Sequence, residues 1–224
     1  MRRFVRENGL AIFFGVAFLA ALAGQAIAGH IAYNAEQAAH GERAISLGRY
    51  LTSSNFGQAV MENWQSEYLQ FTLFIVATVW LVQRGSPESK KLEEAGTEGD
   101  RRQRIGPWAG RGAPKWARVA DWRTAIFGNS LLLVMGTIFL LTLFAQSTTG
   151  WTDYNQSQVE HHTSTVSYWT YIGTATFWEA ALQNWQSEFL AVGSMAVFSI
   201  FLRQRGSPES KPVGAAHGET DVEG

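Results

Sequence analysis

The residues best suited to chemistry are two glutamates that end the same five-residue motif. The sequence Asn-Trp-Gln-Ser-Glu occurs at residues 63–67 and again at residues 184–188. In a helix, residues four apart share a face, so each asparagine lies beside its glutamate. Two facing carboxylates can share a proton or hold a cation. Two glutamines at a similar depth complete a predicted polar binding cluster: Gln25, Asn63, Glu67, Gln146, Asn184 and Glu188.

Four apolar runs must position this cluster, at residues 10–28, 68–82, 126–145 and 189–202. A helix needs about 20 mostly apolar residues to cross a bilayer. The first and third runs are long enough, whereas the second and fourth reach that length only by including the motifs. The glutamates then lie about 21 Å from the cytoplasmic ends of their helices, at 1.5 Å per residue. An ionised carboxylate is costly at that depth, so it should face inward, find partners or be protonated.

The chain repeats itself. Residues 8–90 align without a gap to residues 129–211, and 32 of the 83 pairs are identical. Each copy contains two apolar runs, so each returns the chain to its starting side and the copies have the same orientation. We therefore predict an all-α fold: an integral membrane bundle of four transmembrane helices, made of two parallel tandem helical-hairpin repeats.

The positive charges predict the orientation of this bundle. Of the 18 Lys and Arg residues, 16 lie at the N-terminus, in residues 83–124 or after residue 202. Because positive residues stay cytoplasmic, both termini and the middle segment should be cytoplasmic. Charge also excludes one class of partner, since the net charge of -1 gives no reason to expect nucleic-acid binding.

The predicted domains are a first two-helix repeat (1–90), a cytoplasmic linker (91–121), a second two-helix repeat (122–211) and a disordered tail (212–224). The segment 115–123 suggests a short interfacial helix whose Lys115, Arg118 and Arg123 contact anionic lipid headgroups. Good N-cap residues precede the second and fourth runs: Ser53, Ser54 or Asn55, and Thr174 or Thr176.

Both copies end in the sequence Gln-Arg-Gly-Ser-Pro-Glu-Ser-Lys, at residues 83–90 and 204–211. Gly85 and Gly206 suit a helix C-cap, and the following proline blocks continuation of the helix. This segment is predicted to stop the helix at the cytoplasmic surface. The alternative is a docking motif for a partner protein.

Several site types are not expected. The chain has no cysteine, and no zinc-protease, phosphate-loop, dinucleotide or nucleophile-elbow motif occurs. The histidines read as surface residues, with only His40 and His161 matched between the copies. We expect no enzyme, no cofactor and no metal site. A secretory signal at residues 1–28 is disfavoured, because its apolar run recurs at residues 131–149, where it cannot be a signal.

Two functions remain open. The glutamate cluster can serve a small-solute, ion or proton pathway. Alternatively, the cluster is hydrogen-bonding glue between helices, and the protein is a structural or interaction membrane scaffold or an accessory subunit.

The segments MRRFVRENGL, GQAIAGH, NWQSEYLQF and VWLVQRGSPESK resemble those of a family of small bacterial four-helix membrane proteins known only as a domain of unknown function. The resemblance covers both copies and implies a bacterial inner membrane. It implies no activity, substrate or catalytic residue.

Overall fold

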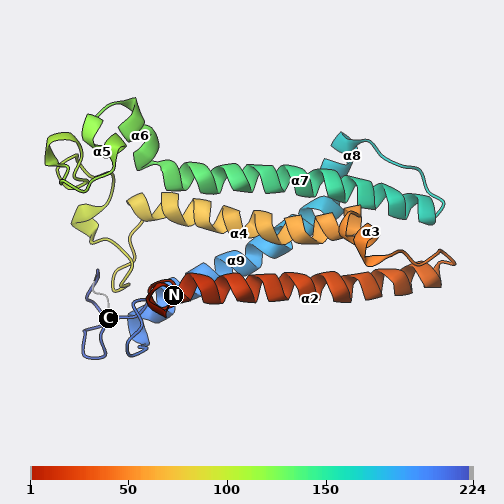
Figure 1. The fold of residues 1–224 in the computed structure, drawn as a ribbon, viewed down its shortest axis with the longest axis horizontal. Helices are drawn as coiled ribbons and strands as arrows, with labels where there is room; N and C mark the ends of the chain where they lie inside the picture. Colours follow the sequence, from red (N-terminus) through yellow and green to blue (C-terminus); the bar gives the residue numbers. More distant parts are fainter. Residues whose placement is uncertain (1, 222–224) are drawn as a thin grey trace. The chain divides into compact units, whose positions relative to one another are not determined.

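The chain is built from helices. The computed structural model describes residues 2–221, and these residues contain no strand. Most of them belong to four long helices (Figure 1), which are α2 (Gly9–Ala39), α4 (Ser54–Trp80), α7 (Ser130–Glu160) and α9 (Ala175–Phe201). The all-α class predicted from the sequence is confirmed.

Shorter helices precede and join the long ones. They are α1 (Arg2–Glu7), α3 (Leu47–Leu51), α5 (Lys115–Val119), α6 (Trp122–Gly128), α8 (Tyr168–Ile172) and the 3-10 helices η1 (Leu92–Glu94) and η2 (Gly106–Trp108). The helices α2 and α7 each have 31 residues, α3 and α8 each have 5, and α4 and α9 each have 27. The second member of each pair begins 121 residues after the first, as Ser130 does after Gly9.

Two of the long helices, α2 and α7, are long and apolar enough to cross a membrane. The other two are also long, but their first halves are polar: Glu62 and Glu67 lie in α4, and Glu179 and Glu188 lie in α9. Length and composition therefore identify two candidate spans, rather than the four predicted from the sequence.

The chain divides into two compact units. The first comprises Met1–Met61 and Ala145–Phe177, and the second comprises Glu62–Phe144 and Trp178–Gly224. The first unit therefore holds α2, α3 and α8, and the second holds α5, α6 and most of α4 and α9.

In the first unit, two asparagines bind the backbone of the loops that follow their helices. The Oδ1 atom of Asn34 accepts a hydrogen bond from the Ile45 amide at 2.8 Å, and its Nδ2 donates to the Ile45 carbonyl at 3.0 Å. Asn155 binds the amide and carbonyl of Val166 at 2.8 and 3.0 Å. Each asparagine thus satisfies both polar backbone groups of one loop residue, as a neighbouring strand would.

Two tyrosines pack against glycines in the same unit. Tyr50 of α3 and Tyr171 of α8 are each only 3% exposed. A Cβ atom at Gly29 would lie 2.2 Å from the Tyr50 hydroxyl, and one at Gly150 would lie 2.4 Å from the Tyr171 hydroxyl. Any larger residue at these two helix positions would displace the tyrosine.

Side-chain caps lie at the N-termini of α4 and α9. The Ser53 hydroxyl accepts a hydrogen bond from the Phe56 amide at 3.2 Å, and the Thr174 hydroxyl accepts one from the Phe177 amide at 3.3 Å. Each satisfies an amide that lacks a partner in the first turn of its helix. The predicted caps at Ser53 and Thr174 are confirmed.

In the second unit, the two identical octapeptides form the same turn. The Gln83 amide donates to Ser89 Oγ at 2.7 Å, and the Gln204 amide donates to Ser210 Oγ at 2.9 Å. These bonds close a loop directly after each helix, which agrees with the predicted helix stop.

The glycines of these turns do not cap the helices, and this part of the sequence prediction was wrong. The helices end at Trp80 and Phe201, several residues before Gly85 and Gly206. The glycines instead have φ angles of 88° and 81° within the turn, where the lack of a Cβ permits positive φ.

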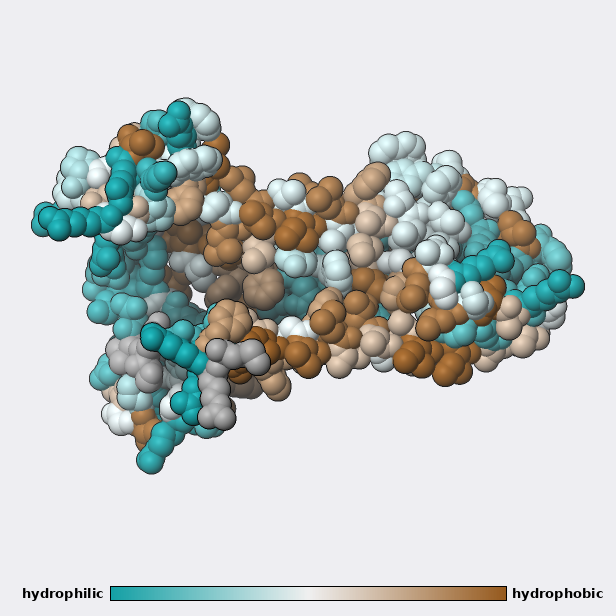
Figure 2. Space-filling view, viewed as in Figure 1, coloured by the Kyte–Doolittle hydropathy of each residue, from teal (hydrophilic) through white to brown (hydrophobic). Residues whose placement is uncertain are grey.

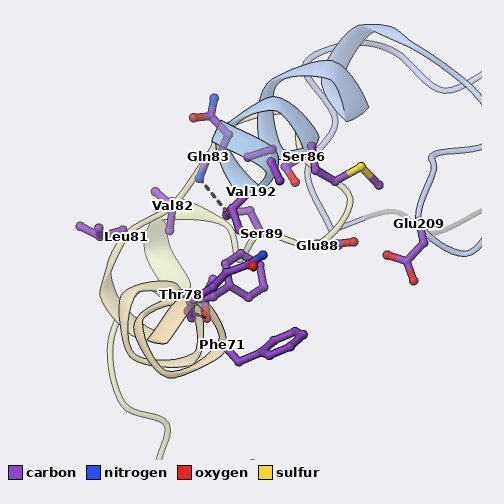
Figure 3. Close-up of a pocket in the computed structure, with 15 residues that line it drawn as sticks. Phe71, Thr78, Leu81, Val82, Gln83, Ser86, Glu88, Ser89, Val192 and Glu209 are labelled. Atoms are coloured by element: carbon purple, nitrogen blue, oxygen red, sulfur yellow. Dashed lines mark hydrogen bonds between the residues drawn. The ribbon is translucent and has the colours of Figure 1, made fainter. Parts of the chain in front are cut away.

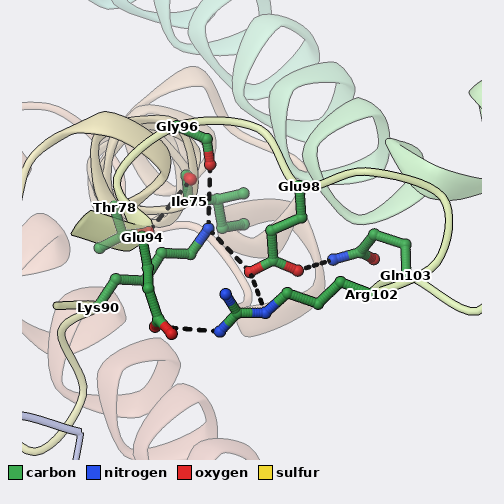
Figure 4. A network of polar contacts seen from close by, with 8 residues as sticks. All are labelled: Ile75, Thr78, Lys90, Glu94, Gly96, Glu98, Arg102 and Gln103. Atoms are coloured by element: carbon green, nitrogen blue, oxygen red, sulfur yellow. Dashed lines mark hydrogen bonds and ion pairs between the residues drawn. The ribbon is translucent and has the colours of Figure 1, made fainter. Parts of the chain in front are cut away.

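The lysine that ends the first octapeptide anchors the segment that follows it (Figure 4). Lys90 Nζ donates to the Gly96 carbonyl at 3.2 Å and pairs with Glu98 at 3.3 Å. Arg102 pairs with Glu94 at 3.0 Å and with Glu98 at 3.6 Å. Part of the segment predicted to be a linker therefore contains an ion-pair network.

The lysine that ends the second octapeptide is 1% exposed. Lys211 Nζ donates to the carbonyls of Ala216, His217 and Glu219 at 3.1, 2.9 and 3.1 Å. Burial lowers the pKa of Lys211, and the nearby charge of Arg203 lowers it further. The predicted disordered tail thus includes residues that form turns around this ammonium, while residues 222–224 lie outside the described range.

The expected interfacial helix at residues 115–123 is two helices. Lys115 and Arg118 lie in α5, which ends at Ala120 with a positive φ of 53°. The Asp121 side chain then accepts a hydrogen bond from the Arg123 amide at 2.8 Å and begins α6. This N-cap starts a new helix axis, so the basic residues belong to two elements.

We predict that Gly29→Ala destabilises the protein by about 1–3 kcal/mol, the usual cost of overpacking, because the new methyl meets the Tyr50 hydroxyl. Thermal unfolding in mild detergent measures the effect. Gly24→Ala is the matched control, since nothing lies within 4 Å of its added Cβ. The double change Gly29→Ala/Tyr50→Phe should recover part of the loss. Equal melting temperatures for the two single variants would contradict the proposed packing.

Candidate functional site

The four motif residues of the predicted cluster lie in the second unit, on two helices. Asn63 and Glu67 are exposed on α4, whereas Asn184 and Glu188 are partly buried on α9. The two carboxylates are near enough for the charge of Glu67 to act on Glu188. The described structure therefore brings the two glutamates within electrostatic range of each other.

A hydrogen bond joins the two motifs at this level. Trp185 Nε1 donates to Gln65 Oε1 at 2.9 Å, and Gln65 Nε2 donates to the Glu62 carbonyl at 3.2 Å. Gln65 is 0% exposed, and its neighbour Ser66 is 2% exposed. The bond satisfies a fully buried amide and fixes α4 against α9. The sequence analysis did not single out Gln65, although its recurrence in both motifs was the available signal.

The two glutamines of the predicted cluster lie in the first unit. Gln25 is exposed on α2, while Gln146 on α7 is 1% exposed and its Oε1 has no hydrogen-bond partner among the described residues. These two positions are equivalent in the aligned copies but have opposite burial. The six-residue cluster as a whole stays a prediction.

A cavity of about 570 Å³ lies in the second unit, between the later parts of α4 and α9 and the turns that follow them (Figure 3). Its walls include Gln70 and Ala191, each of which lies three residues after a motif glutamate. Because three residues are nearly one helical turn, the cavity reaches to within about a turn of Glu67 and Glu188.

The cavity is lined from equivalent positions of the two copies. Four pairs of lining residues are each 121 residues apart: Gln70 and Ala191, Phe71 and Val192, Phe74 and Met195, and Glu88 and Glu209. The last pair comes from the two identical octapeptides. The sequence analysis interpreted those octapeptides only as helix stops or docking motifs, and missed that their glutamates meet at one cavity.

The histidines have ordinary structural contacts. The rings of His40 and His161 lie 5.9 Å apart, and the Nδ1 atom of each contacts the backbone carbonyl four residues earlier. His30 Nε2 lies 2.7 Å from the Ile45 carbonyl. Among residues 2–221, no three His, Cys, Asp or Glu side chains form a group suited to a metal ion.

Comparison with known proteins gives one match. The model of a family described as Domain of unknown function (DUF6766) matches residues 1–222. No curated protein and no solved structure gives a match to the chain.

We predict that Trp185→Phe destabilises the protein by about 1–3 kcal/mol, because it leaves the buried Gln65 carbonyl oxygen without its donor. Thermal unfolding in mild detergent measures the change. Trp80→Phe is the control, since Trp80 is 57% exposed at the last residue of α4, the helix that carries Gln65.

A double-mutant cycle with Gln65→Met separates the hydrogen bond from the lost ring volume. The cost of Trp185→Phe should shrink in the Gln65→Met background, because no polar oxygen then remains to be satisfied. Strictly additive effects would show that the hydrogen bond contributes nothing.

Proposed function

The chain belongs to the DUF6766 family, whose description assigns no activity, and we propose that it is a four-helix membrane protein that binds a proton or small cation between α4 and α9. The observation that carries the proposal is the pair of like-charged carboxylates, Glu67 and Glu188, beside the buried bond between Gln65 and Trp185. We place the protein in a bacterial inner membrane, with both termini cytoplasmic.

The exposure of the apolar helices supports a membrane location. Only 6% of the most apolar part of α2 is buried, and only 17% of that of α7. Large side chains such as Phe13, Leu19 and Leu140 are more than 60% exposed, and apolar surface extends along the helices in Figure 2. The core helix of a soluble protein would bury such residues, whereas lipid covers them without cost.

The lengths of α4 and α9 support two further spans. Each has 27 residues, about 40 Å of helix at 1.5 Å per residue, against a hydrocarbon core of about 30 Å. The equal helix lengths at one offset, and the cavity lined from equivalent positions, favour two tandem repeats of the same orientation. In that arrangement both Asn-Trp-Gln-Ser-Glu motifs lie at membrane depth.

At that depth, two nearby carboxylates cannot both stay ionised without a compensating positive charge. Neither Glu67 nor Glu188 forms an ion pair with a described residue. A shared proton or a bound cation supplies that charge. The cavity that ends about one turn below the pair gives such an ion an approach from the cytoplasmic ends of the helices.

The basic segment near α5 fits the same orientation. Lys115, Arg118 and Arg123 are exposed, together with the indole rings of Trp116 and Trp122. The Arg123 guanidinium lies 5.6 Å from the centre of the Trp122 ring. Exposed indoles beside cations suit contact with anionic headgroups at the cytoplasmic surface.

The alternative function is a membrane scaffold or accessory subunit without transport. It is favoured by the roles of the matched residues in the first unit: Gly29, Asn34 and Tyr50, like their counterparts, hold the loops in place. Under this alternative, the glutamate pair only helps to join helices.

Ion flux tests the choice between these functions. Wild-type protein in liposomes should pass protons or thallium ions under an imposed potential, measured with an enclosed pH dye or a thallium-quenched dye. Glu67→Gln/Glu188→Gln should reduce the flux at least tenfold, because the amides cannot bind the ion. Glu42→Gln/Glu179→Gln, which removes two exposed carboxylates elsewhere, should leave it unchanged. Equal flux in wild-type protein and protein-free liposomes would favour the scaffold.

Single-cysteine labelling tests the four spans. The chain contains no cysteine of its own, so only the introduced cysteine can react. A membrane-impermeant maleimide should label Ala44→Cys and Thr165→Cys in intact cells, and should label Ala95→Cys and Ala215→Cys only after the inner membrane is opened. If only α2 and α7 cross, positions 44 and 95 would share one side, and positions 165 and 215 the other.

A further inference from the structure

The cavity between α4 and α9 has largely apolar walls along the two helices and two acidic side chains at the turns that follow them. Phe71 and Phe74 of α4 line it together with Val192 and Met195 of α9. Two glutamates from the octapeptide turns, Glu88 and Glu209, line it as well (Figure 3). Among the described residues that line it, none carries a positive charge.

These features select the chemistry of an occupant. A volume of about 570 Å³ lies in the range of small-molecule pockets, which is about 300–1,000 Å³. The two carboxylates favour a positive charge and disfavour an anionic lipid headgroup. The aromatic and aliphatic walls favour a large apolar body, and aromatic faces also attract organic cations. Among the described residues, no three His, Cys, Asp or Glu side chains form a group that could hold a metal ion at this cavity.

We propose that this cavity binds an organic monocation with an apolar body, the charge lying toward Glu88 and Glu209 and the body between Phe71 and Met195. The site is distinct from the Glu67 and Glu188 pair, so the inference goes beyond the proposed function. The positive end of the ligand lies at the turns that close the two helices, and its apolar end points into the bundle.

The position of the two glutamates explains how one cation can be shared. Glu88 and Glu209 occupy the same place in two identical octapeptides, and both turns close in the same way through Ser89 and Ser210. Two equivalent turns therefore present two carboxylates to one cavity. A single delocalised positive charge can interact with both, whereas a neutral ligand gains from neither.

Tetraphenylphosphonium and tetraphenylborate separate the effect of charge from that of size, because they have nearly the same size and shape and opposite charge. Binding to the full chain in a neutral detergent is measured by equilibrium dialysis. We expect saturable binding of the phosphonium and none of the borate. Glu88→Gln/Glu209→Gln should weaken phosphonium binding at least tenfold, and Ala191→Trp, which fills the cavity, should abolish it.

Two controls complete the experiment. Glu36→Gln/Glu93→Gln removes the same charge from exposed positions that do not line the cavity and should bind the phosphonium as wild type does. Glu67→Gln/Glu188→Gln should also bind normally, so that a failed flux prediction and a failed binding prediction can be told apart. Melting temperatures confirm that each variant is folded.

The inference is overturned by any of three results. They are equal binding of the phosphonium and the borate, unchanged binding in Glu88→Gln/Glu209→Gln, and no saturable binding by the wild type. Binding that depends on Glu67 and Glu188 instead would also overturn it, while leaving the proposed ion site standing.

Discussion

A chain that leaves a long helix must satisfy the backbone groups of the loop that follows, and an asparagine does this twice in the first unit. Asn34 and Asn155 each bind both the amide and the carbonyl of a loop residue. With the loop held, Tyr50 and Tyr171 fill the space left by glycines on the preceding helices. The helices α4 and α9 begin and end at equivalent residues and therefore have equal lengths. Their later residues line one cavity from matching positions.

The sequence predicted the helical fold but not the full extent of the first helix. The apolar run ends at Ala28, whereas α2 continues to Ala39. Apolarity marks only the part of a helix suited to lipid. In the next three turns, Tyr33 packs against the ring of Tyr50 and Asn34 binds the backbone of Ile45. Gln37 is 8% exposed, so this extension of α2 buries a polar residue. Hydropathy alone cannot distinguish such a helix extension from a loop.

The candidate site was predicted only in outline, because identical residues in the two copies have different surroundings. Gln65 is completely buried and accepts a hydrogen bond from Trp185, whereas its counterpart Gln186 is exposed. Gln146 is buried and its counterpart Gln25 is exposed. A match between copies indicates that a residue type is retained, but packing partners decide which copy is buried. A symmetric cluster was therefore the natural prediction, but matched glutamines differ in burial in both units.

The cavity arises where the two copies differ. At the matched lining positions Phe71 and Val192, α9 carries the smaller side chain. Ala191 is likewise smaller than its counterpart Gln70, and both line the same cavity. At Glu88 and Glu209 the copies are identical, so each copy contributes one carboxylate to the cavity. Differences between the copies thus create the room, and their identity supplies the charge, which is why neither property was evident from one copy alone.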